Sequence, residues 1–151
     1  MRRYKVFKIL IIICLFFYFS SFAQNPIVPN KGLNDPHIHI FNDTAYVYAS
    51  HDKSINNKKF IMEDWWVWSS PDLVNWTKRS VLNPKDTYIG KDFTRCWATD
   101  VAYRNGKYYW YFSEGNQQTG VVVGDSPVGP WEDVLKKPLL TSEFTPTDEY
   151  D

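Results

Sequence analysis

The sequence predicts an all-β protein made of repeated four-stranded units, the arrangement of the blades of a β-propeller, and three observations support this fold class. Two β-hairpin patterns recur, each is followed by a further strand and a Ser-Pro turn leading to a tryptophan, and no segment has the periodicity of a useful amphipathic helix. Four antiparallel strands repeated as a unit describe a blade, so we expect two blades. A two-sheet sandwich could also hold eight short strands, but it would not predict the internal repeat.

The first repeat begins with a hairpin from Asp35 to Ser50, in which apolar residues alternate on either side of Asn42-Asp43. Asn and Asp tolerate the positive φ angles of a tight turn. The continuation over residues 65 to 82 predicts a third strand, a turn at Ser70-Pro71 and a fourth strand near Trp76.

The second repeat has the same order. A hairpin is predicted from Asp100 to Ser113 around Asn105-Gly106, the strongest short hairpin signal, and Ser126-Pro127 then leads to Trp131. The acidic tail from Glu143 to Asp151 resembles a connection between blades. A complete propeller has at least four blades, so we expect this chain to be truncated before the ring closes.

The first 23 residues have the pattern of a secretory signal peptide. Four basic residues precede the apolar stretch Ile9 to Phe19, and the small-residue site Ser21-Phe22-Ala23 follows it. This stretch is shorter than the roughly 20 residues of a membrane span. We predict cleavage after residue 23 and export of residues 24 to 151 to the periplasm or the extracellular space, with no membrane attachment afterwards. Acylation at Cys14 is disfavoured because a bulky residue precedes it.

Charge and composition point to a neutral polymer as the partner. Residues 1 to 23 hold four of the 17 basic residues and none of the 17 acidic ones, so the remainder has 13 basic and 17 acidic residues, a net charge of −4. Without a basic cluster, nucleic acid and anionic membrane surfaces are disfavoured. Seven Trp and ten Tyr suit aromatic sheet packing or a sugar-stacking cleft. A polysaccharide or oligosaccharide is the predicted partner.

Cysteine and histidine usage predicts neither a metal nor another cofactor. Only Cys96 remains outside the signal peptide, and we expect it to be buried and inert rather than nucleophilic. His51 has no second histidine at metal-ligand spacing. His37 and His39 are expected on one face of a strand as an isolated pair, so zinc is disfavoured.

Hairpin topology brings a set of polar and aromatic residues to one end of the blades, because the residues after the second strand lie beside those before the first. That set comprises Asp35, His51 and Asp52 from the first blade and Trp97, Asp100 and Glu114 from the second. Asp35 would point into the central depression of the propeller, although before Pro36 it could merely hold a turn. Asp100 could bond local backbone amides, and Glu114 could be a loop charge.

Four strings of residues together resemble glycoside hydrolase family 43. They are Asp35-Pro36-His37, WSSPDLVNWT from Trp68 to Thr77, WATDVAYRNGKYYWYFS from Trp97 to Ser113, and DSPVGPWED from Asp125 to Asp133. They stand in the order of the family and are distributed from residue 35 to residue 133, so the resemblance extends along nearly all of residues 32 to 151. The resemblance implies a five-bladed β-propeller and inverting hydrolysis, in which two carboxyl groups stand roughly 6.5 to 9.5 Å apart.

The resemblance also implies roles for single residues. Asp35 corresponds to the general base, and Asp151, after TPTDEY, to the aspartate that tunes the pKa of the general acid. The acid itself lies in a later blade of the family, and none of the five glutamates matches its place. Trp97, His51 and Asp52 are predicted to bind substrate. Some relatives hold calcium at the axis, but none is predicted here.

One departure from the family pattern is Thr99, where many relatives have proline. We expect it to alter the start of the strand slightly and to do little else.

The predicted function is hydrolysis of α-L-arabinofuranosyl or β-D-xylosyl linkages in plant-type polysaccharide, with this chain inactive alone because the acid is missing. One alternative is a non-catalytic carbohydrate-binding propeller, in which aromatic platforms such as Trp97 and Trp66 hold a glycan. Another is a galactan-directed enzyme or a different furanosidase of the same fold.

Overall fold

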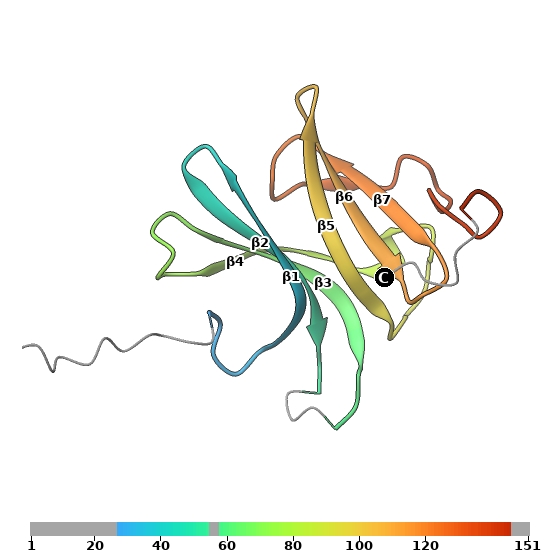
Figure 1. Ribbon diagram of the computed structural model, residues 1–151, viewed down its shortest axis with the longest axis horizontal. Coiled ribbons are helices and arrows are strands. Elements are labelled where there is room, and N and C mark those ends of the chain that lie inside the picture. Colours follow the sequence, from blue (N-terminus) through green and yellow to red (C-terminus); the bar gives the residue numbers. More distant parts are fainter. Residues whose placement is uncertain (1–26, 55–57, 146–151) are drawn as a thin grey trace, which may run out of the picture.

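The computed structural model describes residues 27–54 and 58–145, which form two four-stranded antiparallel sheets (Figure 1). The first sheet contains β1 (Gly32–Phe41), β2 (Thr44–Asp52), β3 (Met62–Ser70) and β4 (Thr77–Leu82). The second contains β5 (Cys96–Arg104), β6 (Lys107–Glu114), β7 (Thr119–Gly124) and β8 (Trp131–Glu132). Strands follow chain order in both sheets, so the predicted pair of four-stranded units is confirmed. The 3₁₀ turn η1 (Pro84–Asp86) lies between the sheets in sequence.

The two predicted hairpin turns are confirmed. Asn42 and Asp43 connect β1 to β2 with φ angles of 49° and 58°, and Asn105 and Gly106 connect β5 to β6 with φ angles of 52° and 80°. Two consecutive positive φ angles match the twist of the flanking strands, which is why these residue types occupy such turns.

The turn between β3 and β4 is organised by Asp72. Its carboxylate accepts hydrogen bonds from the backbone N–H groups of Val74 at 2.9 Å and Asn75 at 2.8 Å. These bonds hold the pKa of Asp72 well below its usual range. Trp76 lies just before β4, whereas its counterpart Trp131 lies within β8.

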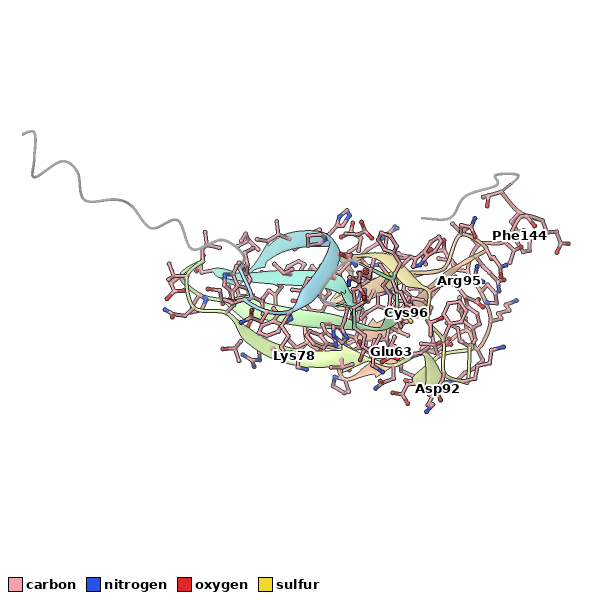
Figure 2. All side chains as sticks on the ribbon, turned by 90° about the horizontal axis from the view of Figure 1, so that it is seen from below. Glu63, Lys78, Asp92, Arg95, Cys96 and Phe144 are labelled. Carbon is pink, nitrogen blue, oxygen red and sulfur yellow. The ribbon has the colours of Figure 1, made fainter. Side chains whose placement is uncertain are left out.

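The hydrophobic core lies between the two sheets, where β1, β2 and β3 contact β5. Aromatic rings dominate it. Tyr48 meets Trp110 at a centroid distance of 5.4 Å, and Trp65 meets Phe112 at 4.7 Å. Figure 2 shows Cys96 in this interior, and burial raises the pKa of its thiol. The prediction of a buried cysteine is confirmed, and the raised pKa disfavours a reactive thiolate.

Thr99 does more than the sequence predicts. Its hydroxyl donates a hydrogen bond to the carbonyl oxygen of Tyr111 at 2.7 Å and accepts one from the indole N–H of Trp110. Both Thr99 and Trp110 are buried. A proline could make neither bond, so Thr99 ties β5 to β6 in a way that a proline cannot.

No helix in the described ranges 27–54 and 58–145 is long and apolar enough to cross a membrane.

Candidate active site

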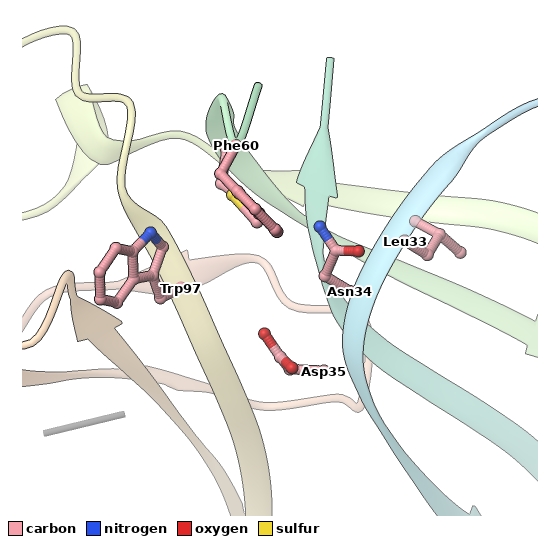
Figure 3. Close-up of a pocket in the computed structure, with 6 residues that line it drawn as sticks. Leu33, Asn34, Asp35, Phe60 and Trp97 are labelled. Atoms are coloured by element: carbon pink, nitrogen blue, oxygen red, sulfur yellow. The ribbon is translucent and has the colours of Figure 1, made fainter. Parts of the chain in front are cut away.

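A pocket of about 530 Å³ opens beside the start of β1 and the start of β5 (Figure 3). Its walls combine one carboxylate, one amide and several apolar side chains. They are Leu33, Asn34, Asp35, Phe60, Met62 and Trp97. The pocket therefore brings the predicted general base, Asp35, together with a predicted sugar-binding residue, Trp97.

Asp35 is directed by a bulge in β1. The register between β1 and β2 shifts between Asn34 and His37, so Asp35 and Pro36 stand outside the regular ladder. Proline has no N–H to give to a ladder, and Asp35 has a φ of 47°, a region that aspartate occupies more readily than most residues. Bulges commonly re-aim a side chain next to a functional site. Here the bulge leaves Asp35 exposed at the pocket.

Trp97 lies at the matching point of the second sheet. The register between β5 and β6 shifts between Cys96 and Thr99, so β5 carries a bulge at the same place as β1. The indole N–H of Trp65 donates a hydrogen bond to the carbonyl oxygen of Trp97 at 2.7 Å. The first sheet thereby fixes the backbone that presents Trp97 to the pocket.

Comparison with known proteins decides the family. The sequence profile of glycosyl hydrolases family 43 matches residues 23–147. The chain belongs to this family. An arabinoxylan arabinofuranohydrolase of Paenibacillus polymyxa is 32% identical, over 78% of this chain and 22% of that protein. A xylosidase/arabinosidase of Bacteroides ovatus is 34% identical, over 70% of this chain and 36% of its own length.

A solved structure gives the same result. A family 43 β-xylosidase/α-arabinofuranosidase from a compost microbial metagenome, in complex with xylotriose, superposes with a TM-score of 0.64 at 32% identity, over 76% of this chain and 38% of that chain. Family 43 enzymes have a five-bladed β-propeller fold, so the two sheets are two blades. Across these three relatives, this chain spans between 22% and 38% of their length.

His51 lies at the predicted end of the first blade, but its side chain is occupied elsewhere. Its Nδ1 is 2.8 Å from Asp64 Oδ1, and its ring stacks on Trp66 at a centroid distance of 3.7 Å. Lys78 Nζ is 3.9 Å from the centre of that same indole. His51 does not line the pocket beside Asp35. Substrate binding by His51 stays a prediction, and these contacts favour a role in packing.

Asp52 is buried and closes the loop between β2 and β3. Its Oδ1 accepts hydrogen bonds from the backbone N–H groups of Ser54 at 2.7 Å and Ile61 at 3.3 Å. This arrangement suits a residue that holds the loop, and it gives Asp52 no place on the pocket wall. Direct substrate binding by Asp52 likewise stays a prediction.

The interpretation of His37 and His39 as an isolated pair is wrong. His39 Nε2 lies 2.6 Å and His37 Nδ1 lies 3.5 Å from Asp100 Oδ1, which connects β1 to β5. Asp100 also accepts the backbone N–H of Val101 at 2.7 Å, the local amide contact that the sequence suggested. Within residues 27–54 and 58–145, no set of three His, Cys, Asp or Glu side chains is placed to hold a metal ion.

The sequence did not single out Asn34 and Phe60, which also line the pocket. Asn34 directly precedes the Asp-Pro pair, and Phe60 is a lone large aromatic in a polar loop, so both carried a weak signal. Asp151, predicted to tune the general acid, and the signal peptide over residues 1–23 lie outside the described residues.

Proposed function

We propose that the complete protein hydrolyses O-glycosidic bonds of α-L-arabinofuranosyl or β-D-xylosyl units in plant-type polysaccharide. The observation that carries this proposal is Asp35, presented by a bulge at a pocket that also holds Trp97. Relatives are described as arabinofuranohydrolases and xylosidases that act on such units, and one solved neighbour holds xylotriose. A carboxylate beside an aromatic wall suits a sugar substrate.

The proposed chemistry is inversion with Asp35 as the general base. Its carboxylate takes a proton from a water molecule while the water oxygen attacks the anomeric carbon of the sugar. The bond from that carbon to the glycosidic oxygen breaks, and the oxygen leaves with a proton from a carboxylic acid on the opposite face. We assign Asp151 to the tuning of that acid's pKa, as the resemblance implies.

Replacement of Asp35 by asparagine tests this role. The Asp35→Asn variant of the full-length protein keeps the side-chain shape but removes the charge that accepts the proton, so we expect kcat on aryl arabinofuranoside or aryl xyloside to fall about 10² to 10⁴-fold. Substrate binding and thermal stability should be retained. Asp43→Asn is a matched control, since Asp43 is also exposed with a positive φ but lies in the distal turn. Unchanged turnover of Asp35→Asn would refute the assignment.

We further propose that the protein is exported, on the basis of the charged start, the apolar stretch and the Ser21-Phe22-Ala23 site. The expected result is a secreted protein that begins at Gln24, and intact-mass measurement of the periplasmic or extracellular fraction checks it. A soluble protein that keeps residues 1–23 in that fraction would contradict this proposal.

A further inference from the structure

We propose that Asn34 and Phe60 form a sugar-binding pair beside Asp35. The Asn34 amide donates a hydrogen bond to a hydroxyl group of a pentose unit, and the Phe60 ring covers the apolar C–H face of the same unit. This inference rests on the proposed function and names two specificity-determining residues for it. Each residue carries an observation that packing alone does not explain.

Asn34 has a buried donor without a partner. Its amide nitrogen is shielded from solvent and has no hydrogen-bond partner among the described residues. Buried polar groups are nearly always paired, and an unpaired one destabilises the protein. The residue itself is held firmly, because its carbonyl oxygen accepts the Ser50 hydroxyl at 3.1 Å and its backbone pairs with Ser50 just before the bulge. A ligand hydroxyl in the pocket would satisfy this fixed donor.

Phe60 is unusual for the opposite reason to Asn34, because its apolar aromatic ring is exposed to solvent. Its exposure of 77% is the highest among the large hydrophobic residues in the described ranges, yet it lines the pocket. The backbone of the next residue, Ile61, is fixed by two hydrogen bonds. Its N–H donates to the Asp52 carboxylate, and its carbonyl oxygen accepts the N–H of Lys53 at 3.0 Å. An exposed ring on an anchored backbone is suited to receive a ligand.

The Asn34 and Phe60 side chains line the same pocket. Figure 3 shows Asn34 and Phe60 above Asp35, with the Asn34 amide nitrogen on the side that faces the Phe60 ring. A pentose presents hydroxyl groups at its edge and C–H bonds on its faces, so it can meet a donor and an aromatic ring at once. Because the amide nitrogen is shielded in the free protein, we expect a side chain of the pocket wall to move as the sugar enters and to expose the donor.

The test measures binding of xylotriose by titration calorimetry in the full-length Asp35→Asn protein, in which bound sugar is not turned over. Asn34→Leu keeps the side-chain volume but removes the donor, and Phe60→Ala removes the ring. We expect each to weaken binding roughly tenfold, the size of one good hydrogen bond or one aromatic contact. Phe144→Ala is the matched control, since Phe144, labelled in Figure 2, is 72% exposed and does not line the pocket.

Thermal unfolding separates a binding role from a structural one. Asn34→Leu should melt at the same temperature as its parent or higher, because it replaces an unpaired buried amide by an apolar group. The inference that Asn34 and Phe60 bind the sugar would be overturned if both variants bound xylotriose as tightly as the parent. It would also be overturned if Asn34→Leu melted at a lower temperature with unchanged binding. Either result would leave the proposed function intact. If the Asp35→Asn parent itself binds no xylotriose, the xylosyl substrate class fails and the inference falls with it.

Discussion

Thr99 shows at the residue scale how one hydroxyl can organise a blade. It donates to the Tyr111 carbonyl and accepts from the Trp110 indole, and the indole has no access to water. Thr99→Val keeps the shape and removes both bonds, which leaves the Trp110 N–H buried and unpaired. We expect the free energy of unfolding to fall by about 1–3 kcal/mol.

Urea unfolding at neutral pH measures this effect in Thr99→Val. The control is Thr44→Val, since the Thr44 hydroxyl makes only a long, exposed contact of 3.4 Å to the carbonyl of Asn42. Equal stability of the Thr99→Val variant and the wild-type protein would show that the buried indole finds another partner.

The sequence could place residues at one end of a blade, but it could not assign the direction of each side chain. Asp35 and Trp97 line the pocket because bulges in β1 and β5 direct them there. His51 and Asp52 lie at the same end and yet contact Trp66 and a loop backbone. Neighbouring strand residues point to opposite faces, so the face of a side chain is predicted by counting residues along the strand. A register shift, also seen between His51 and Asp52, moves the following residues to the other face and makes that prediction fail.

At the scale of elements, the hairpins were predictable because their turn residues encode the backbone angles. Asn42-Asp43 and Asn105-Gly106 both adopt consecutive positive φ angles, which few other pairs accept. The contact of His37 and His39 with Asp100 was not predictable in this way. It joins β1 to β5 across 61 residues between His39 and Asp100, and no local pattern reports such a pairing.

The turn between β3 and β4 should make the free energy of unfolding depend on pH. The pKa of Asp72 is lower in the folded protein than in the unfolded chain, chiefly because the carboxylate accepts hydrogen bonds from Asn75 and Val74. A lowered pKa stabilises the folded protein at every pH above the pKa of the unfolded chain, about 3.9 for aspartate. That stabilisation disappears as the pH falls through the pKa of the folded protein. We therefore expect Asp72→Ala to be less stable than the wild-type protein at pH 7, with the difference shrinking below about pH 4.

Urea unfolding of both proteins at pH 7 and in acid checks this expectation. Asp92→Ala is the control, because Asp92 makes only a surface ion pair of 2.8 Å with Lys85. A difference between Asp72→Ala and the wild-type protein that is constant with pH would refute the role of the Asp72 charge.

At the scale of the whole molecule, the first blade leaves an apolar outer face. Ile38 and Ile40 alternate along β1 with the two histidines that contact Asp100, and they are 54% and 62% exposed. Their cross-strand partners Val47 and Ala45 share this face but are buried, at 3% and 2% exposure. The exposed part of the face is therefore formed by Ile38 and Ile40, and we call these two side chains the outer face. Contiguous apolar surfaces promote association.

We therefore predict that residues 24–151, expressed alone, self-associate and show no glycosidase activity. Activity should be missing because inversion needs two carboxyl groups, and Asp35 is the only carboxylate among the described residues of its pocket. Association should follow from the outer face and from the unpaired strand edges. Size exclusion across a concentration series, with assays on aryl arabinofuranoside and xyloside, measures both properties.

A paired substitution isolates the cause of the association. Ile38→Thr with Ile40→Thr keeps β-branched side chains on β1 but makes the outer face polar, so the monomer fraction should rise. Val74→Thr is the matched control, because Val74 is also 62% exposed but lies in the turn before β4. A wild-type fragment that is monomeric would refute the association, since the outer face would then be tolerated in water. Turnover by the fragment would refute the prediction that it lacks a general acid. It would point to Glu114 as the proton donor, a residue whose Oε2 accepts a hydrogen bond from the Gln118 amide at 2.7 Å.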